Sequence, residues 1–102
     1  MQKVTVLYGH PVDPEAFEKY YRDHHMPLVA KMKGVAKVEL TKMLGGPGGS
    51  PPEYYRMAEL YFSDATQMQA TMGSAEGQAT AADLANFATG GAKVIIGTVE
   101  NQ

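Results

Sequence analysis

Apolar positions along the chain follow two different periods, which divide it into short strands and longer helices. Four segments are rich in β-branched and aromatic residues, as strands are: Lys3–Gly9, Val35–Leu44, Glu53–Phe62 and Ala92–Val99. Four residues at helical spacing predict a helix from about Pro14 to Met32: Phe17, Tyr21, His24 and Leu28. Two further helical stretches are expected, one from the possible cap at Ser63 and Asp64 to Gly73, and one from Ser74 to about Phe87.

Residues that start or end regular structure lie between these segments. Asp13 before Pro14 is typical of a helix start, because Asp caps the first turn and Pro fits it. The stretch Gly45–Pro52 can form neither helix nor strand and is predicted to be a loop joining two strands. The resulting order, β-α-β-β-α-β, predicts one α+β domain over residues 1–102, with the ferredoxin-like arrangement of an antiparallel sheet and helices on one face.

The predicted strands carry apolar residues on both faces. In the last strand Val94 and Ile96 point one way and Ile95 and Val99 the other, because side chains alternate along a strand. A sheet with one free face is expected to be polar there. We therefore expect a second copy of the chain to cover that face, which would make a homodimeric α/β barrel.

The composition and net charge of the chain argue against some classes of binding partner. The 102 residues are 44% hydrophobic and 20% charged, as is usual for a globular protein, and the net charge is −2. Without a run of Lys or Arg, neither nucleic acid nor an anionic membrane is expected as the main partner. The absence of Cys excludes disulfides and thiolate chemistry. No segment has the length of a signal peptide's apolar region or of a bilayer span, so the expected location is the cytoplasm.

Two adjacent histidines in the first helix are the main candidates for chemistry. His24 lies near the centre of the apolar stripe, and His25 lies at its edge, one turn after Tyr21. An imidazole at the edge of a core, beside a phenol, can exchange protons near neutral pH. We therefore expect His24 to pack and His25 to face a pocket. The alternative is that both histidines only pack, or that His24 faces water.

Proline 27 should alter the backbone at these histidines. Pro27 has no N–H to donate to the carbonyl of Asp23, and its ring crowds that carbonyl. The helix is therefore expected to kink or loosen near His24 and His25.

The predicted strands contribute further polar candidates. Tyr8, Glu59 and Tyr61 lie in strands, and Glu59 has apolar neighbours on its own face. A buried carboxylate needs a partner or a raised pKa, so Glu59 is either a general base or one half of an ion pair across the dimer. Asp83 is expected to have a structural role, as a cap or in a local pair.

Several stretches resemble the EthD family, named for ethyl tert-butyl ether degradation. The stretch FEKYYRDHHMPLV (17–29) resembles the family's signature helix, and its HxPLV motif begins at His25. The resemblance continues through GGSPPEYYRMAELYFSD (48–64) and AADLANFATG (81–90). It implies a ferredoxin-like fold, a homodimeric α/β barrel and His25 as the motif histidine. This chain departs from the family pattern at Glu59, where relatives often have His, and at Arg56, where they have a small residue.

The resemblance also implies a function. Members are described as oxidoreductase-type enzymes that act on small hydrophobic or aromatic metabolites in the degradation of organic compounds. We expect a pocket between the first helix and the sheet, with His25 as the catalytic residue and four residues binding substrate: Tyr8, Tyr21, Glu59 and Tyr61. The alternatives are a cofactor-free isomerase or lyase, and a non-enzymatic ligand-binding protein that assists an oxygenase.

No metal and no cofactor are expected. Two histidines at i and i+4, a common metal-binding spacing, are absent because Leu28 and Val29 follow one turn after His24 and His25. No nicotinamide fingerprint or phosphate-binding loop is present either. Haem is the group that would most easily overturn this expectation, since a single His can ligate it.

Overall fold

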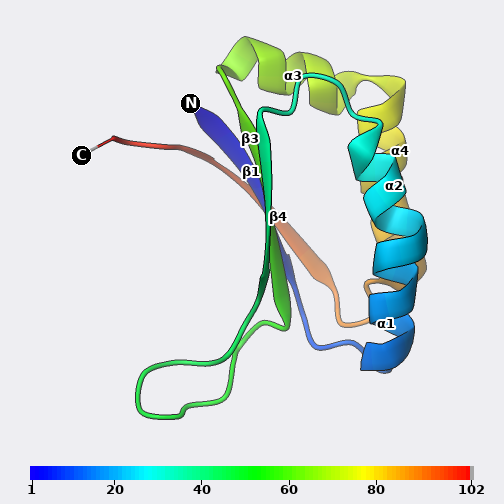
Figure 1. The fold of residues 1–102 in the computed structure, drawn as a ribbon, viewed down its shortest axis with the longest axis vertical. Coiled ribbons are helices and arrows are strands. Elements are labelled where there is room, and N and C mark those ends of the chain that lie inside the picture. The colour runs from blue at the N-terminus through cyan, green and yellow to red at the C-terminus, as the bar shows by residue number, and fades with distance from the viewer. Residues whose placement is uncertain (102) are drawn as a thin grey trace.

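The computed structural model describes residues 1–101, which form a four-stranded antiparallel sheet with all helices on one face (Figure 1). The strand order is β2-β3-β1-β4. The elements are β1 (Gln2–Tyr8), α1 (Pro14–Tyr20), the π-helical turn η1 (Tyr21–His25), α2 (Met26–Ala30), β2 (Lys37–Lys42), β3 (Arg56–Phe62), α3 (Ala65–Gly73), α4 (Ala75–Phe87) and β4 (Ala92–Thr98). The predicted α+β class and ferredoxin-like order are confirmed.

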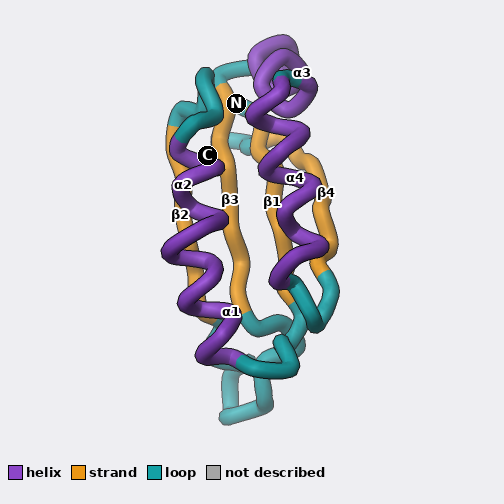
Figure 2. The backbone as a smooth tube through the Cα atoms, turned by 90° about the vertical axis from the view of Figure 1, so that its right-hand side faces the viewer, coloured by secondary structure: helices purple, strands orange, loops and turns teal. Residues whose placement is uncertain are grey.

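Two columns of helix cover the sheet. Figure 2 shows α1 and α2 in front of β2 and β3, and α4 in front of β1 and β4. In the sheet, Val4 lies opposite Leu60 of β3 and Ile96 of β4, so these side chains share the helix-facing side. The core lies between the two layers, and four aromatic rings form its centre: Tyr8, Phe17, Tyr21 and Phe87.

The segment predicted as one long helix contains a wider turn. The N–H of Met26 donates to the carbonyl of Tyr21, five residues back, as in a π-helix. Pro27 follows at once, and it has no N–H with which to continue α-helical bonding. The loosened backbone predicted at the histidines is therefore present.

The wider turn reverses the predicted roles of the two histidines in packing. A π turn takes more residues than an α turn, so it brings His25 onto the face of Tyr21. The two rings are nearly parallel, with centroids 5.7 Å apart, and only 4% of His25 is exposed. His24 is exposed and lies beside Tyr20. The prediction that His24 would pack in the core, with His25 at its edge, was wrong because it assumed α-helical periodicity throughout.

The other face of the sheet has no helix over it. In Figure 1 the loop between β2 and β3 and the C-terminal end both extend to that side. Its residues are mixed: Leu7, Met57 and Ile95 alternate with polar side chains. Lys3 forms an ion pair with Glu59 at 2.6 Å on the same face. The expectation that this face would be apolar is therefore only partly correct.

We still expect a homodimer in solution. Apolar side chains of the edge strands are exposed on both faces, a pattern that marks interaction surfaces: Val38 and Leu40 in β2, and Val94, Ile95 and Ile96 in β4. Sedimentation equilibrium at micromolar concentration should give twice the chain mass of 11.0 kDa. Ile95→Glu, on the helix-free face, should weaken the dimer, whereas Val12→Glu in the exposed loop after β1 should not. A folded wild-type monomer under these conditions would contradict the expectation.

Candidate functional site

An apolar cavity lies between the helices and the sheet. Strands β1 and β3 form its floor, and η1, α2 and α4 form most of its walls. The centres of water-sized molecules have about 70 Å³ of room in it. One water needs about 10–15 Å³ on this measure, so several waters or part of a small organic molecule would fit. The cavity lies where the sequence predicts a ligand pocket, between the first helix and the sheet, and its binding of a ligand remains a prediction.

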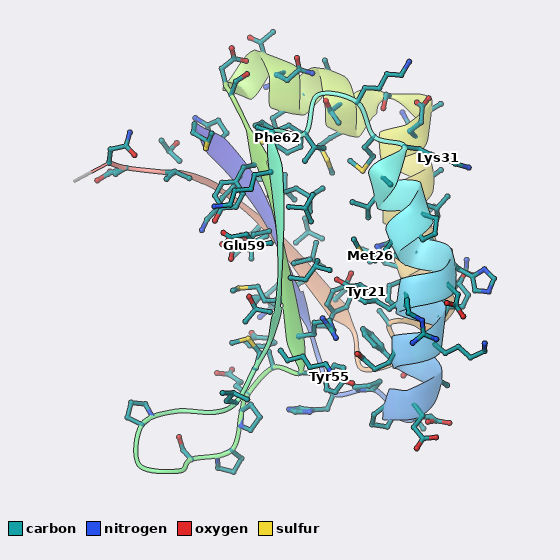
Figure 3. The ribbon with its side chains drawn as sticks, in the orientation of Figure 1. Tyr21, Met26, Lys31, Tyr55, Glu59 and Phe62 are labelled. Atoms are coloured by element: carbon teal, nitrogen blue, oxygen red, sulfur yellow. The ribbon has the colours of Figure 1, made fainter. Side chains whose placement is uncertain are left out.

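The cavity opens toward the edge strands. Val38 and Leu40 of β2 and Val94 of β4 line it, yet they are between 39% and 50% exposed. Met26 and Met72 also line it, and the unbranched methionine side chain adapts easily to the shape of a neighbour. Figure 3 shows the side chains of Met26 and Tyr21 extending from the helix toward the sheet.

Three of the predicted site residues meet at this cavity: Tyr8, Tyr21 and His25. The hydroxyl group of Tyr21 is buried, and no group among residues 1–101 meets the distance and angle of a hydrogen bond to it, although the hydroxyl group of Tyr8 lies near enough to affect its pKa. Burial raises the pKa of Tyr21 to about 12 and that of Tyr8 still further. Both phenols are therefore neutral at pH 7 and can donate hydrogen bonds. A buried hydroxyl group without a partner is uncommon, and it marks a position where a ligand oxygen could bind.

His25 is paired with Asp83 of α4. Its Nδ1 lies 2.9 Å from Asp83 Oδ2, and both residues are buried. The other carboxylate oxygen, Oδ1, accepts hydrogen bonds from Tyr20 OH at 2.7 Å and from Asn86 Nδ2 at 3.0 Å. Burial alone would raise the pKa of Asp83, but the hydrogen bonds from Asn86, Tyr20 and His25 outweigh it and lower that pKa.

The ionised carboxylate fixes the protonation pattern of the imidazole. Because Asp83 can only accept, Nδ1 of His25 carries the hydrogen, and in the neutral ring Nε2 keeps its lone pair. No hydrogen bond to Nε2 is found among residues 1–101. The ring therefore offers a base whose orientation is set by Asp83 and by stacking on Tyr21.

Asp83 is the residue that sequence reasoning undervalued. We expected a cap or a local pair, but its partner His25 is 58 residues away in the chain. Helix α4 buries Thr80, Asp83 and Phe87 on one face, at helical spacing, against η1 and α2. That spacing is visible in the sequence and places a carboxylate on a buried face, which requires a polar partner.

Glu59 and Tyr61 do not reach the cavity. Both belong to β3 but point to the helix-free side of the sheet, as Figure 3 shows for Glu59. Glu59 pairs with Lys3, and Tyr61 OH donates to Glu39 at 2.7 Å, which raises the pKa of Tyr61 to about 12. The structure therefore does not bring them together with His25, and their role in binding substrate remains a prediction. The ion pair expected for Glu59 forms within the chain.

No metal centre is evident in the part of the chain that the structure describes. Nowhere in residues 1–101 do three His, Cys, Asp or Glu side chains lie close enough to hold a metal ion. Over the same residues, no helix has the length and apolar character needed to cross a bilayer. That the protein binds no cofactor remains a prediction, which the colour and metal content of the purified protein would test.

Comparison with known proteins identifies the family. The model of the EthD domain matches residues 9–91. The chain belongs to the EthD family. It is 40% identical, over 95 residues, to an 11.0 kDa protein from the thcB-thcC intergenic region of Rhodococcus erythropolis, covering 93% of this chain and 91% of that one. An EthD family protein of Bacillus halodurans is 33% identical with a TM-score of 0.90, covering 98% of this chain and 99% of that one.

More distant structures share the fold of this EthD chain. SnoaB of Streptomyces nogalater, a cofactor-independent oxygenase, is 14% identical with a TM-score of 0.66, covering 99% of this chain and 93% of its own. A dimeric protein of Bacteroides fragilis with a ferredoxin-like fold is 16% identical with a TM-score of 0.65, covering 96% and 95%. At these identities the likeness establishes the fold alone.

Proposed function

We propose that this EthD chain binds a small aromatic or otherwise apolar molecule carrying an oxygen atom, and that His25 takes a proton from it. The observation that carries the proposal is the pairing of His25 with Asp83 at the wall of an apolar cavity, beside the partnerless hydroxyl group of Tyr21. A base, a hydrogen-bond donor and an apolar surface are the parts that such a reaction needs.

The cavity suits a flat apolar ligand that displaces soft side chains. Apart from Tyr8, Tyr21, His25 and Thr80, the groups lining it are apolar, so they would bury the body of an organic molecule and not a sugar or a nucleotide. Its room of about 70 Å³ is less than the roughly 150 Å³ of a cavity that holds benzene. A ring would therefore move methionine side chains or extend toward the mouth at β2 and β4.

The proposed step is a proton transfer. Nε2 of His25 accepts a proton from an O–H or an activated C–H group of the ligand, and the electron pair of the broken bond stays on the ligand. The imidazolium that forms is stabilised by Asp83, while the ligand oxyanion accepts a hydrogen bond from Tyr21. Return of the proton to a second position would give the isomerase or lyase chemistry considered from the sequence.

The oxidoreductase activity implied by the family would begin with the same step. The ligand anion would be the electron donor, and dioxygen the electron acceptor. SnoaB, of the same fold, is a cofactor-independent oxygenase. We therefore place the proton transfer first in either reaction. Saturable binding without proton transfer would instead support the non-enzymatic, ligand-binding function.

Ionisation of a bound phenol tests the proposal. 4-Nitrophenol serves as the probe, because its neutral and ionised forms absorb at different wavelengths. The wild-type protein should bind it saturably and lower its apparent pKa, whereas His25→Gln, which has no base, should bind it and lower that pKa much less. His24→Gln, on the exposed side of the same turn, is the matched control and should behave as the wild type. Absence of binding, or equal ionisation in the His25 variant, would contradict the proposal.

A further inference from the structure

A buried guanidinium group lies against the aromatic wall of the cavity. Arg56, at the start of β3, is 8% exposed and is paired in register with Tyr8. Its guanidinium carbon lies 4.9 Å from the centroid of the Tyr21 ring, within the range of a cation–π contact. Arg56 therefore contacts the residue that carries the partnerless hydroxyl group.

The charge of Arg56 is only partly neutralised by its carboxylate partner. Glu18 of α1 accepts hydrogen bonds from both Nε and Nη2 of Arg56, and also from Tyr55 OH at 3.0 Å. Lys42 lies 3.4 Å from the same carboxylate. Burial tends to raise the pKa of Glu18, but the hydrogen bonds from Arg56 and Tyr55 outweigh it and lower that pKa, so Glu18 is ionised at pH 7. The side chain of Glu18 is 27% exposed and that of Arg56 only 10%, so solvent screens the carboxylate more than the guanidinium group, and the charge of Arg56 beside Tyr21 is neutralised only in part.

We infer that Arg56, acting through Tyr21, makes the cavity selective for ligands in the oxyanion form, such as phenolates and enolates. The inference rests on the proposed function and adds the class of ligand. A cation against the face of the Tyr21 ring draws electron density from it and makes its O–H a stronger donor. In the dry interior that donor and the charge of Arg56 favour an anionic oxygen over a neutral one.

The charges around the cavity also suit the proposed proton transfer, because the negative charge that forms on the ligand lies near Tyr21 and Arg56. The transfer starts from the neutral form of the His25 ring, with ionised Asp83 beside it. After transfer, the imidazolium and Asp83 neutralise each other, and the new negative charge lies on the ligand oxygen. The hydroxyl group of Tyr21 is then next to that charge, and Arg56 is behind it. Arg56 is thus a positioning residue, since it acts through Tyr21 and does not line the cavity.

A pair of probes of similar shape separates the charge preference from binding itself. 4-Nitrophenol at a pH at which it is ionised is compared with its neutral methyl ether, 4-nitroanisole. The wild-type protein should bind the phenolate at least about tenfold more tightly than the ether. Arg56→Met should abolish most of that preference and leave the affinity for the ether within about twofold. Lys42→Met is the matched control, because Lys42 contacts the same carboxylate but is 65% exposed, and it should keep the preference.

The possible outcomes separate the oxyanion selectivity inferred for Arg56 from the ligand binding proposed for the cavity. If the phenolate preference persists in Arg56→Met, or if the wild type binds both probes equally, the inference is overturned and the cavity still binds ligands. If neither probe binds the wild type, both are overturned. Should Arg56→Met fail to fold, Tyr21→Phe removes the hydroxyl group through which Arg56 acts. The preference should then fall to the same extent, and its persistence would overturn the inference.

Discussion

Replacing His25 with alanine is expected to lower the free energy of unfolding by about 2–4 kcal/mol, whereas His24→Ala should change it by less than about 0.5 kcal/mol. The first change removes a buried ring that stacks on Tyr21 and leaves the buried carboxylate of Asp83 without one of its donors. Tyr20 and Asn86 still donate to Asp83, which keeps the cost below that of a fully unpaired charge. His24 is exposed, so its loss removes little packing.

Urea denaturation at pH 7 measures both variants under the same conditions. The order of the two effects is the decisive result, because α-helical periodicity predicts the opposite order and the π turn at Tyr21–His25 predicts this one. A larger loss for His24→Ala than for His25→Ala would mean that the wider turn is absent in solution.

Asp83→Asn is expected to switch the tautomer of His25 and to reduce proton transfer by about 10²- to 10⁴-fold. Oδ1 of Asp83 accepts from two donors, Tyr20 OH and Asn86 Nδ2, so the amide oxygen of an asparagine would have to take that position. The amide NH₂ would then face Nδ1 of His25 and donate to it. The ring would carry its hydrogen on Nε2, which would then have no lone pair with which to accept a proton.

Ionisation of bound 4-nitrophenol reads out this effect, and Asn86→Ala is the control. The control removes one donor to Oδ1 but keeps the carboxylate, so the tautomer should be retained. If Asp83→Asn ionises the probe as well as the wild type does, Asp83 does not set the state of His25.

The same variant should also change the acid sensitivity of the fold. The pKa of Asp83 is lowered in the folded protein, so its ionised form stabilises the fold above about pH 3.9, its ordinary unfolded pKa. That contribution is lost as the pH falls through the lower, folded pKa. The stability difference between the wild type and Asp83→Asn should therefore shrink when urea denaturation is moved from pH 6 to pH 3. Other carboxylates with lowered pKa values, such as Glu18, are common to both proteins and cancel.

The helices and strands could be predicted from the sequence because each one depends mainly on residues close to it along the chain. The cap at Asp13, the strand alternation from Arg56 to Phe62 and the loop at Gly45–Pro52 all depend on near neighbours in sequence. From the sequence, the π turn could be predicted only as a loosening of the helix near Pro27. The missing N–H of proline shows which α-helical hydrogen bond is lost, but it does not show which hydrogen bond forms instead. The wider hydrogen bonding of this single turn was enough to reverse the positions of His24 and His25.

The candidate site was harder to predict because it depends on which face of the sheet the helices cover and on which side chains of the two layers meet. Period-two alternation correctly placed Glu59 and Tyr61 on one face of β3, but it does not say which face the helices cover. The pairing of His25 with Asp83 joins residues 58 positions apart, and the contact of Arg56 with Tyr21 joins a strand to a helix. Such contacts follow from tertiary packing: spacing in the sequence indicates a buried carboxylate at Asp83 but not the residue with which it pairs.

The most direct measurement of the central claim is the ¹⁵N NMR spectrum of the His25 imidazole, with and without 4-nitrophenol. Without the probe, we expect the neutral ring to carry its hydrogen on Nδ1 and to leave Nε2 as a free acceptor, because Asp83 accepts from Nδ1. With the probe bound, Nε2 should shift to the value of a protonated nitrogen, while the resonances of His24 remain unchanged. A neutral ring that carries its hydrogen on Nε2 before the probe is added, or an unchanged His25 spectrum when the probe is bound, would show that His25 is not the base of this cavity.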